Sequence, residues 1–226
     1  FLSTYQWDRP LSMLNQGGDL NIGIKDYLMY EGFSYKLIPI KNKVKSMDLG
    51  LVDTDELYSK LKDSYCFDAL SRTDYCVDYQ NLYTFLGVMS IRNLFVSSAN
   101  AFIDAGENDR AEEMLDKCQE VLKPEQYPYD NSILGWSSNM FFPIEMVKDY
   151  YTLGKPEKAK ALAKELLDEL EESINFYVDF LPEYKSDFEY CCQLVYYLSS
   201  EVEKAGDPEF ANMIESELAA FLSIKG

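Results

Sequence analysis

The carboxylates are the side chains of this sequence best suited to acid–base chemistry, and they number 39. Two adjacent pairs, Glu112 with Glu113 and Asp168 with Glu169, supply the residue types that a general acid and a general base require. Adjacent residues of a helix do not share a face, however, so neither pair would converge on one substrate atom. With so many acids, adjacency is expected by chance, and we interpret both pairs as solvated helix surface.

The sequence contains no histidine, which removes the commonest general base, the usual pH switch and the most frequent zinc ligand. It also contains no glycine-rich phosphate loop and no serine or cysteine nucleophile motif. We therefore expect no catalytic residue, no cofactor and no metal site in this chain. A metal site built only of carboxylates stays open as an alternative, although no pattern points to one.

The net charge of −18 argues against a nucleic-acid binder, because neutralising phosphates requires a basic face. Binding to an anionic bilayer through bulk charge is disfavoured for the same reason. Residues 36–45 depart from this balance, with four lysines and no acid. We interpret this stretch as a solvated loop, with a contact to lipid head groups or to a neighbouring domain as the alternative.

The five cysteines form no CxxC pair and are odd in number, which argues against a disulfide framework. Cys118 shares a predicted helical face with apolar residues, so we expect a buried thiol that acts as a small hydrophobe. A bridge between Cys66 and Cys76 is the one pairing that stays open. The two residues are near in sequence, and a periplasmic location would permit the bond.

The elements that position these side chains follow a pattern that occurs three times: AGENDRAEEML from Ala105, LGKPEKAKALA from Leu153 and AGDPEFANMIE from Ala205. In each copy a glycine follows an apolar-periodic run, and an alanine five residues later opens a second run. A glycine there adopts the left-handed conformation that ends a helix, and the small alanine lets the second helix pack closely against the first. The sequence therefore predicts three helical hairpins, at about residues 79–123, 139–181 and 187–224.

The apolar positions around each glycine resemble the tetratricopeptide signature. In the first copy they are Phe95, Ala99 and Phe102 before Gly106, then Ala111, Leu115 and Cys118 after it. The second copy fits with Val147, Tyr150, Ala159, Ala163 and Leu166, whereas the third has Glu215 at a normally apolar place. The glycines are 48 and 52 residues apart, against about 34 in the standard repeat, so we expect lengthened hairpins that stack less regularly.

Residues 1–52 differ from the rest of the chain. Phe33, Tyr35 and Leu37 alternate with polar residues, which predicts a strand, and residues 22–30 are interpreted as a short helix closed by Gly32. The run Asp53–Glu56 resembles a capping box and predicts a short helix. The expected fold is mostly α: tetratricopeptide-like helical hairpin repeats (an α–α superhelix) over residues 53–226. A small irregular α/β segment with short strands, residues 1–52, is expected to pack on this body.

In tetratricopeptide arrays the first helix of each pair lines a concave groove that binds extended peptides. Position by position, this resemblance implies a groove formed by Asn93, Asn100, Lys148, Tyr151, Tyr196 and Glu203. The alternative is that these are ordinary surface residues of a scaffold that only spaces other parts. The eighteen tyrosines are likewise interpreted mainly as core-edge residues rather than as stacking platforms for sugar rings.

A second resemblance covers most of residues 7–180. The runs WDRPLSML, GIKDYLMYEGFSYKLIPIK and VDTDELYSKL are similar to the C-terminal extramembrane region of a bacterial multi-pass membrane protein family of uncharacterised function. That family is related to the protein O-mannosyltransferases, which are GT-C-type glycosyltransferases with lipid-linked donors. The resemblance implies a place on the periplasmic side of the inner membrane, after the last membrane helix. It also implies that the catalytic acids lie in the membrane core, which this chain lacks.

Two observations agree with an extramembrane piece of a longer protein. No run of eighteen apolar residues occurs, so no segment is expected to span a membrane. The chain opens at Phe1 with neither an initiator methionine nor a signal-peptide pattern, so we expect an excised or processed piece.

The first functional hypothesis is a periplasmic accessory or protein-interaction domain of a membrane glycosyltransferase-like protein. It would position a polypeptide acceptor or partner next to the membrane-embedded part of the same protein. The alternative is a purely structural or oligomerisation module without a ligand of its own. An independent soluble enzyme is the third possibility, and the missing histidines and motifs disfavour it.

Overall fold

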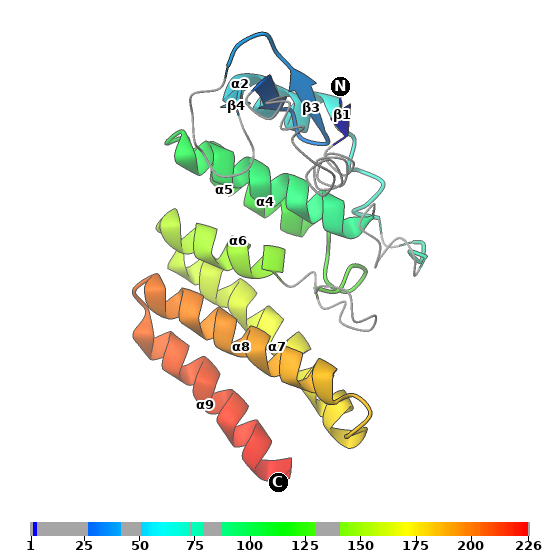
Figure 1. The fold of residues 1–226 in the computed structure, drawn as a ribbon, viewed down its shortest axis with the longest axis vertical. Helices are drawn as coiled ribbons and strands as arrows, with labels where there is room; N and C mark the ends of the chain where they lie inside the picture. The colour runs from blue at the N-terminus through cyan, green and yellow to red at the C-terminus, as the bar shows by residue number, and fades with distance from the viewer. Residues whose placement is uncertain are drawn as a thin grey trace, which may run out of the picture. The chain divides into compact units, whose positions relative to one another are not determined.

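The computed structural model describes residues 2–3, 27–41, 51–72, 74–78, 87–129 and 141–225 (Figure 1). The chain divides by contacts into two compact units, Phe1–Leu122 and Lys123–Gly226. The described residues form seven α-helices and a small four-stranded sheet, which confirms a mostly helical fold with short N-terminal strands. The domain boundary expected between residues 52 and 53 falls inside the first unit and stays a prediction.

The sheet of the first unit has the strand order β1–β3–β2–β4. Its strands are β1 (Leu2–Ser3), β2 (Leu28–Tyr30), β3 (Ser34–Leu37) and β4 (Leu51–Val52). β3 pairs antiparallel with β1 and β2, and β2 pairs parallel with β4. The predicted strand is therefore present as β3, and it lies inside the sheet rather than at its edge.

The prediction of a helix over residues 22–30 is wrong for its last three residues, because Leu28–Tyr30 form strand β2. All three residues are buried, and β2 pairs on both sides, with β3 and with β4. β3 follows β2 after three residues and β4 lies about twenty residues after β2, and pairing with both strands overrides the helical pattern of these residues. Residues 22–26 lie outside the described residues.

Of the two hydrogen bonds that make up a capping box, the one accepted by the Asp53 side chain is confirmed. The backbone N–H of Glu56 donates to Asp53 Oδ1 at 3.0 Å and begins helix α2 (Thr54–Ser59). The Glu56 carboxylate pairs with Lys60 Nζ at 3.0 Å. The helix is short, as expected, and continues through a π-helical turn, η2 (Lys60–Ser64).

The other six helices of the described residues form three hairpins. These are α4 (Val88–Asp104) with α5 (Asn108–Val121), α6 (Phe141–Thr152) with α7 (Pro156–Asp179), and α8 (Lys185–Lys204) with α9 (Pro208–Lys225). Figure 1 shows the helices of each pair side by side, joined by a short loop. In the second unit, α8 also packs against α6 and α7. Residues 79–86 and 139–140, where two hairpins were expected to begin, lie outside the described residues.

The same turn joins the two helices in all three hairpins. The N–H of Gly106 donates to the Ile103 carbonyl (2.9 Å), and that of Glu107 donates to the Phe102 carbonyl (2.8 Å). The corresponding bonds recur around the second and third glycines, which makes each turn a Schellman motif. The three glycines have φ values of 76°, 71° and 94°, and no atom lies within 4 Å of an added Cβ. Glycine is therefore required here by its backbone conformation rather than by crowding.

The third hairpin replaces an apolar contact with a polar one. Seven residues before and nine residues after each glycine, the first two hairpins bury the pairs Ala99 with Leu115 and Val147 with Ala163. The third has Ser199 and Glu215 at these places, and Ser199 Oγ donates to Glu215 Oε1 at 2.9 Å. The same Oγ lies 3.1 Å from the Ala211 carbonyl, so the single hydroxyl hydrogen is shared between the two acceptors. Glu215 is exposed in this hairpin, so its carboxylate reaches solvent and also has the Ser199 hydroxyl as a partner.

The predicted burial of Cys118 is confirmed. Cys118 is buried, and burial raises the pKa of its thiol to about 12. Cys66 and Cys76 are exposed free thiols in this structure. Among the described residues, no helix is long and apolar enough to cross a membrane.

Candidate interaction surface

One member of each adjacent acid pair, Glu113 of the first and Glu169 of the second, is hydrogen-bonded to another part of the protein. Glu113 accepts a hydrogen bond from the Tyr58 hydroxyl at 2.5 Å, and Glu169 Oε2 accepts one from the backbone N–H of Tyr129 at 2.9 Å. The bond from Tyr58 and the nearby Lys62 hold the pKa of Glu113 below its ordinary value. A carboxyl with a lowered pKa is a poor proton donor at neutral pH, so this pair does not resemble a general-acid site.

Two of the predicted groove residues, Asn93 and Asn100, lie on α4 in the first unit. Asn93 Oδ1 accepts from Ser97 Oγ at 2.8 Å, and Asn100 Nδ2 donates to the Val96 carbonyl at 3.1 Å. Both side chains are half-buried. Their amide groups are therefore already engaged by neighbours on the same helix.

Lys148 and Tyr151 lie on α6 in the second unit. Lys148 Nζ pairs with Glu145 Oε2 at 2.9 Å, and the Tyr151 hydroxyl donates to Asp207 Oδ2 at 3.2 Å. Burial, and then Asp207, raise the pKa of Tyr151 well above its ordinary value, so the phenol stays protonated. Tyr151 is thus tied to the α8–α9 loop instead of pointing a free hydroxyl at a ligand.

Asp207 links three elements of the second unit. Its Oδ2 also pairs with Lys160 Nζ of α7 at 2.8 Å, and its Oδ1 accepts from the backbone N–H of Phe210 at 3.2 Å. The second bond caps the start of α9, where Pro208 occupies the first turn. Asp207 therefore joins the α6–α7 hairpin to the α8–α9 hairpin.

Tyr196 and Glu203 lie two turns apart on α8 and are exposed, with 54% of Tyr196 accessible. An aromatic ring that accessible is available for a partner. Among the predicted residues of the second unit, these two are the freest to bind, whereas Lys148 and Tyr151 are held within the protein.

The facing sides of α6 and α8 carry a group of six side chains, of which sequence reasoning identified only Lys148. We call this group the α6–α8 seam: Phe141, Glu145, Lys148, Tyr197, Glu201 and Lys204. The Phe141 and Tyr197 ring centroids are 5.6 Å apart, and Lys204 Nζ pairs with Glu201 at 2.6 Å. On each helix the members recur at i, i+4 and i+7, which is the helical spacing that could have identified them. The predicted groove, which was derived by counting positions from each glycine, contained Tyr196 and did not contain Tyr197.

The charged groups of the α6–α8 seam shift one another's pKa values. Partial burial disfavours the charged form of Lys148, but Glu145, Asp149 and Glu201 outweigh it and raise the Lys148 pKa. Burial, followed by Glu201 and Glu145, raises the pKa of Tyr197. The seam therefore holds a protonated phenol together with lysines and carboxylates that pair with each other, so a polar, extended chain would have to exchange these pairs for its own hydrogen bonds.

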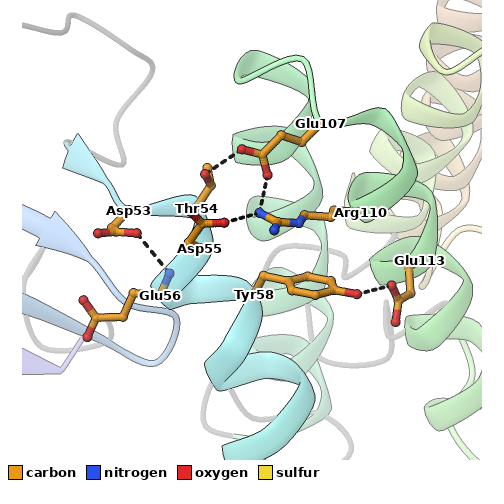
Figure 2. Close-up of polar contacts among 8 residues, drawn as sticks. All are labelled: Asp53, Thr54, Asp55, Glu56, Tyr58, Glu107, Arg110 and Glu113. Carbon is orange, nitrogen blue, oxygen red and sulfur yellow. Dashed lines mark hydrogen bonds and ion pairs between the residues drawn. The ribbon is translucent and has the colours of Figure 1, made fainter.

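In the first unit, a polar junction holds α2 against α5, as Figure 2 shows. Arg110 Nη1 lies 2.8 Å from both Asp55 Oδ1 and Glu107 Oε2, and its guanidinium lies 4.6 Å from the centroid of the Tyr58 ring. Thr54 Oγ1 donates to Glu107 Oε1 at 2.7 Å. These contacts join the short helix α2 to the first hairpin.

These features define a mostly helical protein in which a four-stranded sheet precedes helical hairpins. Residues 1–56 match the family model of TMEM260-associated domain 2, which covers the sheet and the beginning of α2. TMEM260 is related to the protein O-mannosyltransferases, so the match agrees with the family resemblance of these residues. No curated protein and no solved structure matches the chain.

Proposed function

We propose that this chain is an extramembrane, tetratricopeptide-like accessory domain of a membrane protein related to the protein O-mannosyltransferases. The domain binds a polypeptide acceptor or partner and positions it near the membrane-embedded part of the same protein. It lies on the periplasmic side of the inner membrane. The match to TMEM260-associated domain 2 and the three hairpins with the same turn support this proposal.

One observation supports polypeptide binding above the others. The first helices of two successive hairpins, α6 and α8, pack against each other in the second unit. Along them lie the polar and aromatic side chains of the α6–α8 seam and, beside it, the exposed Tyr196 and Glu203. Extended peptides are recognised by hydrogen-bond donors and acceptors in a row and by exposed aromatic rings, and Tyr196 is such a ring here.

The test is capture of periplasmic and outer-membrane polypeptides by the whole chain, with a photo-cross-linking residue in place of Tyr196. Tyr75 is the control position, because it is an exposed tyrosine of the first unit that the proposal does not involve. We expect specific cross-links at position 196 that a Glu203→Lys substitution abolishes. Equal cross-linking at position 75, or none at 196, would contradict the proposal.

A structural module is the second candidate, and one feature favours it. At the end of α7 and the start of α8, four exposed apolar side chains gather: Phe176, Phe180, Leu181 and Tyr184. The Phe176 and Phe180 ring centroids are 4.9 Å apart. A contiguous apolar patch of this kind is typical of a surface that another protein part covers. Under this candidate, Phe176→Ser with Phe180→Ser weakens assembly with the membrane part, while Glu203→Lys does not.

A further inference from the structure

A depression in the first unit lies outside the proposed groove. It lies between α5 and the segment formed by η2 and residues 65–68, and its volume is about 710 Å³. Volumes of this order accommodate one or two large side chains or a small ligand. Because it is built entirely from the first unit, it is independent of the α6–α8 seam.

The floor of the depression is apolar. Leu61, Phe67 and Met114 line it and are each at most 7% exposed, and Tyr65 completes it with a half-buried ring. The aromatic rings are held in place, with the centroid of Tyr65 6.1 Å from that of Phe67, and the centroid of Phe67 4.9 Å from that of Phe95. A fixed aromatic floor suits an aliphatic stem or a flat cationic group.

The rim of the depression is strongly acidic. It carries six carboxylates and two lysines, so its formal charge is −4: Asp68, Asp109, Glu112, Glu113, Asp116 and Glu120 against Lys62 and Lys117. Both lysines already pair with rim acids, Lys62 with Glu113 at 3.3 Å and Lys117 with Glu120 at 3.1 Å. The depression therefore attracts cations and repels phosphate or carboxylate ligands.

The chemistry of the lining distinguishes between kinds of cation. Among the described residues, no group of three or more acids or cysteines is arranged to hold a metal ion. An apolar floor would also gain nothing from a hydrated ion, whereas it covers the stem of a lysine or an arginine. An arginine can, in addition, stack on an aromatic ring while its edge donates to carboxylates.

We propose that this depression binds a basic segment of another polypeptide, with an arginine or lysine stem on the Phe67–Met114 floor and its charge among the rim carboxylates. An apolar neighbour in the bound segment covers the rest of the floor. The site gives the chain a second polypeptide contact, selective for basic sequence, that does not depend on the proposed groove.

The experiment measures fluorescence anisotropy of a short labelled peptide in which arginine alternates with leucine, titrated with the whole chain. Peptides with glutamate in place of arginine, or with glycine in place of leucine, test charge and apolar contact separately. The variant Glu112→Lys with Asp116→Lys reverses two rim charges. Its matched control, Asp168→Lys with Glu172→Lys, makes the same change at the same spacing on exposed positions of α7.

We expect the arginine–leucine peptide to bind, and the rim variant to weaken binding by about tenfold or more while the α7 control changes it less than about twofold. Binding should also weaken at high salt. Circular dichroism of both variants confirms that the helices are retained. Equal loss in the two variants, or equal binding of the glutamate or the glycine peptide, would overturn the site, as would no binding of the arginine–leucine peptide.

Discussion

At the scale of single residues, the clearest difference among the three hairpins is the Ser199–Glu215 pair. Two positions that are apolar in the other hairpins are polar here, and the hydroxyl of Ser199 on α8 donates to the carboxylate of Glu215 on α9. Ser199 is buried, so its hydroxyl would be costly without an acceptor. The effects of substituting Ser199 and Glu215 on the free energy of unfolding should therefore not be additive.

Ser199→Ala is expected to lower the free energy of unfolding by about 1 kcal/mol, because Glu215 loses its donor. Ser199→Ala combined with Glu215→Leu removes the polar group at both positions, so no acceptor is left without its donor, and the double variant should lose less stability than the sum of the two single variants. Urea unfolding of the two single variants and the double variant gives the coupling energy. Strictly additive effects would show that the two residues act independently.

Asp207 is a residue whose titration should affect the stability of the second unit, because it contacts both hairpins of that unit. The ion pair with Lys160 is the main reason that its pKa lies below the ordinary value, and the Phe210 N–H adds to the effect. A lowered pKa in the folded state means that the stabilisation is present above the unfolded pKa of about 4 and is lost as the pH falls through the folded pKa.

Thermal unfolding followed from neutral pH down to acid tests this expectation. Asp207→Asn should be less stable at neutral pH, and its loss of stability on acidification should be smaller than that of the wild type. Asp207→Ala also removes the α9 cap, for which about 1 kcal/mol is expected. Tyr151→Phe is the control, since it removes only one of the three contacts of Asp207. Parallel pH profiles for wild type and Asp207→Asn would contradict the assignment.

At the scale of elements, the polar junction between α2 and α5 holds the short helix α2 against the first hairpin (Figure 2). Arg110 is central to it, because one guanidinium contacts Asp55, Glu107 and the face of the Tyr58 ring. α2 has only six residues, so it depends on such tertiary contacts rather than on its own helical propensity.

Arg110→Ala should therefore loosen α2 without unfolding the second unit. We expect amide hydrogen exchange in residues 54–59 to become several-fold faster, with exchange in α8 and α9 unchanged. Lys117→Ala is a suitable control, because Lys117 lies on the same helix as Arg110 and its ammonium pairs with Glu120 of that helix. Unchanged exchange in α2 would mean that the apolar contacts of Leu57 are sufficient to hold it.

At the scale of the whole molecule, the division into two units predicts separable folding. The second unit has its own buried core, drawn from both of its hairpins, and Asp207 joins those hairpins internally. A segment with its own core can fold alone. Residues 123–226 expressed alone should thus retain helical circular dichroism and unfold cooperatively on heating. A gradual loss of signal without a transition would show that this unit needs the first.

Much of the local structure could be predicted because its causes are local. The glycine turns depend on one backbone conformation and on hydrogen bonds within six residues, and the Asp53 cap depends on a spacing of three. The buried positions around Gly106 and Gly154 likewise follow helical periodicity. The functional hypothesis and the predicted groove do not follow from local sequence in this way, and both stay predictions.

The helix expected over residues 22–30 failed where pairing with other segments decides the outcome. Leu28–Tyr30 form a strand because β3 and β4 both pair with it, whereas the prediction for Tyr196 stays a prediction. The sequence by itself determined the hairpins, their turns and the excess of acid, since these follow from backbone preference, periodicity and composition. Only the tertiary structure decided the sheet, the α6–α8 seam and the acidic depression, because each requires side chains that are far apart in the chain to lie together.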